Sequence, residues 1–126
     1  MASQPGALAH IAAVTDVRFW VAERHPQADW VCERELAREA HLAGTGHQHR
    51  PDGLVVLDGR ELPVEVELSH KRPGRRERIM RELVARYGQA VYFAAEGPRR
   101  GLEQTARALG GGRVRVLGLP SGGETA

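Results

Sequence analysis

The 126-residue chain has one cysteine, Cys32, which excludes an intramolecular disulfide framework and a cysteine-rich zinc site. It has no apolar run near the roughly 20 residues that a membrane-spanning helix needs, so we expect no membrane association. The first residues, MASQPGALAHIAAV, contain neither a basic segment nor a continuous apolar segment. We therefore expect no secretory signal and a cytoplasmic location.

A phosphate-binding glycine motif is also missing. The three glycines at 110–112 precede an apolar run, whereas the glycines of a P-loop follow a strand and end in Lys-Ser or Lys-Thr. We therefore expect no nucleotide cofactor. His47 and His49 have spacing that would allow chelation of a transition metal, but the surrounding sequence contains no evident third ligand.

The composition is that of one folded unit. Hydrophobic residues make up 41% of the chain and charged residues 27%, which permits a packed core and argues against overall disorder. The length is that of one ordinary domain, and no linker divides it. We expect a single domain over 1–120 and a flexible tail over 121–126.

Basic residues gather in one segment, although the formal net charge is only +2. From Lys71 to Arg86 they outnumber the acidic residues Glu77 and Glu82, and such a patch is typical of binding to a phosphate backbone. The alternative is a solvated helix face without a partner. The DNA-binding candidates are Lys71, Arg72, Arg75, Arg76 and Arg78.

Hydrophobic spacing predicts the elements of the first half of the chain. Apolar residues recur at helical spacing before Pro26, and an Asp58-Gly59 pair between apolar runs indicates a β-hairpin. The stretch AGTGHQHRP is typical of a loop. The expected elements are a helix over 7–24, a strand over 30–36, a loop over 43–51 and strands over 54–57 and 62–68.

The second half alternates between helices and buried strands. An apolar stripe with helical spacing follows Pro73-Gly74 and ends near Gly88. The expected elements after this helix are a strand over 90–95, a helix over 101–109 and a strand over 114–119. The order helix, three strands, helix, strand, helix, strand predicts an α/β fold, in which a mixed sheet of about five strands lies between helices in three layers.

Acidic residues are placed unusually within the predicted hairpin. Strand alternation puts Glu65, Glu67 and Lys71 on one face of the strand that includes 62–68, and Asp52 begins the partner strand. Carboxylates that converge in this way need a cation, a proton or an arginine. A divalent metal is the economical solution, and Mg²⁺ prefers a few carboxylates together with water and phosphate. The alternative is an ordinary strand with solvated glutamates.

A metal held by Asp52 and Glu65 would polarise a phosphodiester oxygen and lower the pKa of an attacking water. In this interpretation Glu67 is a third ligand or orients the water, and Lys71 offsets charge that develops on the phosphate. The adjacent basic residues would hold the flanking nucleic-acid backbone.

The string PD–x12–ExE, preceded by a helix and followed by helix, strand, helix and strand, resembles the PD-(D/E)XK nuclease superfamily. Residues 50–87 resemble more narrowly the replication-relaxation family of actinobacterial plasmid proteins. The resemblance implies a restriction-endonuclease-like core, a Mg²⁺ or Mn²⁺ cofactor, and Asp52 and Glu65 as the metal-binding acids. The function it implies is that of a DNA endonuclease or nickase in plasmid or mobile-element processing.

The chain departs from the superfamily pattern in two respects. Glu67 stands where most members have a lysine. Lys71, four residues further along the strand and about 13 Å away, is either a relocated substitute or simply a phosphate-binding residue. Glu33 resembles the auxiliary acid that some members supply, or else is an exposed strand glutamate. The sequence also shows no winged-helix region of the kind that the replication-relaxation family usually carries, so we expect targeting through a partner protein or a homodimer.

Two non-catalytic alternatives stay open. The chain is either a nuclease-fold module that binds DNA or a partner without cutting, or a small interaction protein whose basic patch meets an acidic partner. The first alternative predicts salt-sensitive DNA binding that does not depend on Asp52.

Overall fold

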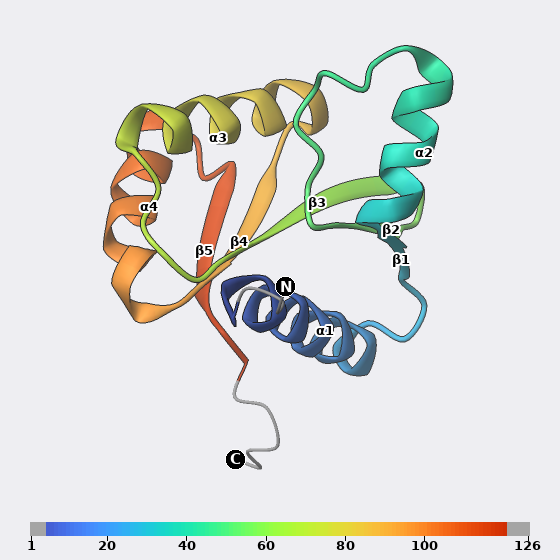
Figure 1. Ribbon diagram of the computed structural model, residues 1–126, viewed down its shortest axis with the longest axis horizontal. Helices are drawn as coiled ribbons and strands as arrows, with labels where there is room; N and C mark the ends of the chain where they lie inside the picture. The colour runs from blue at the N-terminus through green and yellow to red at the C-terminus, as the bar shows by residue number, and fades with distance from the viewer. Residues whose placement is uncertain (1–4, 121–126) are drawn as a thin grey trace.

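The computed structural model describes residues 5–120, which form helices on both sides of one open β-sheet (Figure 1). The elements in chain order are α1 Pro5–Arg24, β1 Asp29–Cys32, α2 Glu33–Ala43, β2 Gly53–Leu57, β3 Arg60–Glu67, α3 Pro73–Tyr87, β4 Ala90–Ala94, α4 Glu96–Leu109 and β5 Val114–Gly118. None of the helices within 5–120 has the length and apolar character needed to span a bilayer.

The five strands lie in the order β1-β2-β3-β4-β5. β1, β2 and β3 pair antiparallel, whereas β3, β4 and β5 pair parallel through crossovers that contain α3 and α4. The predicted α/β class, with a mixed five-stranded sheet between helices, is confirmed. The carboxyl ends of β3 and β4 therefore meet the start of β2 at one end of the sheet.

The expected strand over 30–36 is wrong in its second half. β1 ends at Cys32, and a helix, α2, begins at Glu33, so the order of elements contains one helix more than the sequence indicated. Two glutamates in the first turn suit the positive helix N-terminus, and Gly44 ends the helix in the left-handed conformation with φ of 76°. Leu36 is the one residue of α2 that is buried, so most of the helix lies at the surface.

The hairpin predicted from Asp58-Gly59 is present. Leu57 pairs with Arg60, which leaves a two-residue loop, and both loop residues have positive φ, 53° at Asp58 and 76° at Gly59. Positive φ at both central residues is the requirement of the turn whose twist matches that of the strands. The turn sets the register that places Gly53 opposite Val64.

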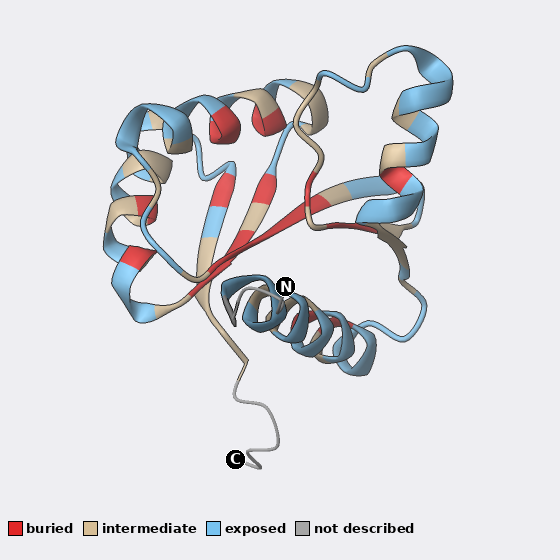
Figure 2. Ribbon diagram, viewed as in Figure 1, coloured by how far each residue is buried: buried red, intermediate tan, exposed pale blue. Residues whose placement is uncertain are grey.

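Buried residues form a layer on each face of the sheet (Figure 2). On one face Val17 of α1 packs with Val64 and Val66 of β3, and on the other face Leu83 of α3 packs with Tyr92 of β4. Because side chains alternate along a strand, Glu65 and Glu67 point to the α3 and α4 side. They are only 3% and 6% exposed there, so two carboxylates lie in the interior of the protein.

Candidate functional site

Two hydrogen bonds to carboxylate oxygens connect the start of β2 with β3 around Asp52 and Glu65. The backbone N–H of Asp52 donates to Oε2 of Glu65 at 3.2 Å, and the N–H of Val66 donates to Oδ2 of Asp52 at 2.7 Å. The hairpin register explains this arrangement, because Gly53 opposes Val64 and the preceding residue therefore lies beside Glu65. The structure thus brings together the two acids that the sequence singled out first.

Burial dominates the electrostatics of Glu65. Loss of water raises the pKa of Glu65 to about 7, and the charges of Asp52 and Glu67 act in the same direction. A hydrogen bond from His49 opposes this rise: its Nε2 lies 3.2 Å from Oε1 of Glu65. The same bond raises the pKa of the His49 imidazole above its usual value, although burial of the ring opposes it.

His49 is held in place by α3. Its backbone N–H donates to Oε2 of Glu82 at 2.8 Å, and its carbonyl oxygen accepts a bond from Nη2 of Arg86 at 2.7 Å. The sequence indicated only a loop here and a weak chelating pair of histidines. Glu82 lies 33 residues from His49 along the chain, and the pattern contained no signal for this contact.

His10 of α1 approaches the site from the other side of the sheet. Its Nε2 lies 3.3 Å from Oδ1 of Asp52. His10 was not among the candidate site residues, because a single histidine in a predicted helix does not reveal what the helix packs against. Oδ2 of Asp52 thus accepts a hydrogen bond from the backbone of Val66, and its Oδ1 faces the imidazole of His10.

Lys71 lies elsewhere than expected. β3 ends at Glu67, so Lys71 does not continue the strand about 13 Å further on; the chain turns back, and Nζ of Lys71 donates to Oε1 of Glu67. α3 starts at Pro73, and Ser69 and His70 belong to the connection that precedes it. The expected three-acid cluster is therefore an Asp52–Glu65 pair next to a Glu67–Lys71 ion pair.

Glu33 is not a strand residue. It lies in the first turn of α2, and its carboxylate accepts a bond from Nε of Arg50 at 3.1 Å. Its side chain is 49% exposed. The observed partner of Glu33 is thus an arginine that precedes Asp52 by two residues.

Most of the candidate DNA-binding residues are exposed at the start of α3. Arg72, Arg75 and Arg78 are exposed, and Lys71 is partly exposed. Arg76 differs, because it is half-buried and its Nε donates to Oγ1 of Thr105 in α4 at 3.3 Å. Arg76 therefore bridges two helices, and its removal would disturb their packing as well as the surface charge.

The side chains around Asp52 and Glu65 offer few donors to a divalent cation. Within 5–120, no three histidine, cysteine, aspartate or glutamate side chains are placed so that they could hold one metal ion. Mg²⁺ commonly takes only one or two carboxylates and completes its shell with water and substrate phosphate. Asp52 and Glu65 fit this requirement, because a carboxylate oxygen that accepts one hydrogen bond keeps a second lone pair.

The hydroxyl of Tyr92 is buried beside these acids. Tyr92 pairs with Glu65 across β3 and β4 and is 1% exposed, and its hydroxyl has no hydrogen-bond partner within the part of the chain that the structure describes. Burial, together with the charges of Glu65, Glu67 and Asp52, raises the pKa of Tyr92. The hydroxyl therefore stays protonated and contributes little to stability.

We expect Tyr92→Phe to leave the free energy of unfolding unchanged or to raise it by up to about 1 kcal/mol, because it removes a buried polar group without a partner. Urea unfolding of the two proteins measures the difference. A loss of more than about 1 kcal/mol would contradict this prediction and would show that the hydroxyl is hydrogen-bonded in solution.

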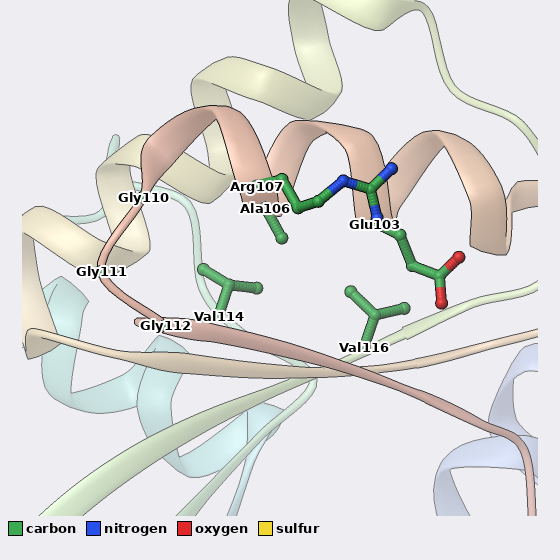
Figure 3. Close-up of a pocket in the computed structure, with 8 residues that line it drawn as sticks. All are labelled: Glu103, Ala106, Arg107, Gly110, Gly111, Gly112, Val114 and Val116. Atoms are coloured by element: carbon green, nitrogen blue, oxygen red, sulfur yellow. The ribbon is translucent and has the colours of Figure 1, made fainter.

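A hollow of about 420 Å³ lies away from the acids, between α4 and the edge strand β5 (Figure 3). Glu103 and Arg107 of α4 and Val114 and Val116 of β5 line it. Glu103 and Arg107 are the charged residues of its lining, and neither Asp52 nor Glu65 is part of it. The hollow therefore does not extend the site around Asp52 and Glu65.

No protein-family model, curated protein or solved structure matches the chain. The features of the chain that bear on its function are therefore the geometry of the acid site and the PD–x12–ExE motif.

Proposed function

We propose that the protein is a metal-dependent DNA endonuclease or nickase with a restriction-endonuclease-like core, acting on plasmid or other mobile-element DNA. The observation that carries this proposal is the pair of backbone hydrogen bonds, Asp52 N–H to the Glu65 carboxylate and Val66 N–H to the Asp52 carboxylate, that places the two acids side by side. The resemblance of the PD–x12–ExE string to the PD-(D/E)XK superfamily supports it and is the basis of the plasmid assignment.

Asp52 and Glu65 would hold Mg²⁺ or Mn²⁺. When bound, the ion would polarise the scissile phosphodiester and lower the pKa of an attacking water. The backbone N–H groups of Asp52 and Val66 orient the two carboxylates, so little reorganisation is needed for binding. His10 is 40% exposed and can leave Asp52 at little cost in buried surface.

Glu67 and Lys71 would act as a pair. The buried carboxylate of Glu67 holds the ammonium group of Lys71 near the acids, where a positive charge stabilises a phosphate. Lys71 would thus perform the role of the superfamily lysine although it reaches the site from the connection that follows the strand. Arg72, Arg75 and Arg78 would hold the phosphate backbone next to the cut.

Asp52→Asn tests this function. We expect the variant to fold, because the asparagine oxygen still accepts from the N–H of Val66, and to lose plasmid cleavage in Mg²⁺ or Mn²⁺ by at least about 100-fold. Conversion of supercoiled plasmid to nicked and linear forms measures the rate.

The matched control is Asp58→Asn in the hairpin turn, an exposed position where asparagine tolerates positive φ. It is expected to cut like the wild type, and EDTA is expected to stop both. Equal cleavage by Asp52→Asn and wild type would refute the proposed metal site.

A second candidate function, a DNA-binding module without catalysis, is favoured by one observation. Each acid already has a basic partner from this chain: His10 faces Asp52, His49 bonds Glu65, and Lys71 bonds Glu67. This alternative predicts no cleavage by the wild type, together with equal DNA retention by wild type and Asp52→Asn in a gel-shift assay.

A further inference from the structure

A groove opens beside Asp52 on the side of the sheet that α1 covers. Its volume is about 660 Å³, which lies within the range of pockets that bury a small organic ligand, about 300–1,000 Å³. One wall is a face of α1, and the other is formed by β1, the start of α2 and the segment before β2. The residues that line the α1 wall are His10, Ile11, Val14, Thr15 and Arg18.

Positive charge predominates in this groove. Arg18, Arg34 and Arg50 contribute to its lining, against the two carboxylates of Glu33 and Asp52. The guanidinium of Arg50 is engaged with Glu33, whereas the structure records no ion pair for exposed Arg18 or Arg34 within 5–120. Guanidinium groups bind phosphate oxygens through paired N–H donors.

The floor of the groove is aromatic and apolar. Trp30 and Cys32 point to the same face of β1 by strand alternation, and both line the groove. Ile11 of the opposite wall is 61% exposed, so the groove has apolar surface on both sides. An aromatic floor between arginines is the combination by which proteins bind unpaired nucleic-acid strands, because the ring stacks on bases and the arginines follow the phosphates.

We propose that this groove binds an unpaired DNA strand and leads it to Asp52. This inference rests on the proposed nuclease function and specifies its substrate: DNA that is single-stranded or locally opened next to the cut. A groove of this volume admits a few nucleotides of one strand and excludes the double helix.

The topology supports such a path. β1 and α2 lie beyond β2 at one edge of the sheet, and the β3–α3 connection lies on the other side of the acid pair, toward β4 and α4 (Figure 1). A strand that left the groove past Asp52 would therefore meet Lys71 and Arg72. The two basic regions then hold the same strand on both sides of the acids.

Binding in EDTA tests the inference without cleavage. We expect fluorescence anisotropy to show that a labelled single-stranded oligonucleotide binds at least about 10-fold more tightly than the duplex of the same sequence. Charge reversal by Arg18→Glu with Arg34→Glu is expected to weaken binding of the single strand at least about 10-fold. The matched control, Arg107→Glu with Arg115→Glu, reverses two exposed arginines outside the groove and is expected to change affinity less than about 3-fold.

The emission of Trp30 gives a second measurement that reports on the groove itself. In a Trp20→Phe protein Trp30 is the only indole, and we expect saturating single-stranded oligonucleotide to quench its emission, because bases stack near the ring. Tighter binding of duplex, equal losses in both double variants, or unquenched Trp30 would each overturn the inference.

These results are separable from a failure of the nuclease proposal. Absence of plasmid cleavage with intact, groove-dependent binding of single strands would refute the nuclease and keep the groove assignment. Duplex cleavage that depends on Asp52 but is unchanged by Arg18→Glu with Arg34→Glu would keep the nuclease and refute the groove assignment.

Discussion

Glu65→Gln is expected to stabilise the protein in EDTA at neutral and higher pH and to abolish metal-dependent DNA cleavage. In the folded protein Glu65 is 3% exposed and its pKa is raised to about 7, against about 4.5 in the unfolded chain. Ionising this carboxyl in the fold is therefore unfavourable. Glutamine removes that cost, its oxygen still accepts from the N–H of Asp52, and its NH₂ group takes the place of the carboxylate oxygen that faces Nε2 of His49.

The stability of the wild type depends on pH because the folded protein binds a proton at Glu65 more tightly than the unfolded chain does. Between pH 4.5 and about 7 the folded protein holds a proton on Glu65 that the unfolded chain has released, so the stability of the wild type falls as pH rises. The raised pKa of His49 acts in the same direction, since its charged form is favoured in the fold and is lost as pH rises. At pH 8 we expect Glu65→Gln to be more stable than the wild type by roughly 1–3 kcal/mol.

Urea unfolding in EDTA at several pH values between 5 and 8 measures this effect, and plasmid cleavage in Mg²⁺ measures the loss of activity. Glu65→Gln is expected to have a flatter stability profile, to cut at least about 100-fold more slowly, and to lose any rise in Tm that Mn²⁺ gives the wild type. The matched control is Glu61→Gln, an exposed glutamate of the same strand. A variant that is less stable at pH 8, or that cuts like the wild type, would contradict the assignment of Glu65.

Gly53→Ala is expected to lower stability by about 1–3 kcal/mol and to disturb the groove as well. A Cβ added at Gly53 would lie 2.1 Å from Cζ2 of Trp30, well inside van der Waals contact, so the indole must move. Gly53 directly follows Asp52 and pairs with Val64, so a shift of this strand start also moves the acid pair. We therefore expect weaker binding of single-stranded DNA together with the lower urea midpoint.

Gly46→Ala is the control for Gly53→Ala. An added Cβ at Gly46 meets no atom within 4 Å, and Gly46 has no positive φ, so the substitution is expected to change the free energy of unfolding by less than about 0.5 kcal/mol. Equal stability of Gly53→Ala and Gly46→Ala would show that Trp30 does not lie over Gly53 in solution.

Local periodicity was sufficient to predict most of the strands and to single out the two principal acids, Asp52 and Glu65. The alternation in 62–68 predicted a strand with Glu65 and Glu67 on one face, and Asp58-Gly59 predicted the hairpin that brings Asp52 beside Glu65. Both inferences hold because they depend on geometry repeated every two residues and on one tight turn.

The helix α2 was missed for a physical reason. Residues 33–43 have helical amphipathic spacing, but the alternation over 30–36 favoured a strand that continued past Cys32, and the local pattern does not mark where β1 ends. Lys71 was misplaced for a related reason: nothing in the alternation marks the residue at which β3 ends, and the chain leaves the strand after Glu67.

The fold class, the hairpin and the spacing of the acids were predictable because each follows from the order of neighbouring residues. The groups that surround those acids depend on tertiary packing and were not predictable in this way. His10, His49 and Trp30 come from a helix, a loop and another strand, and their contacts depend on how these elements pack. A side chain's chemistry can be identified from sequence, but the partner that shifts its pKa or closes its pocket is brought there by packing over long chain separations.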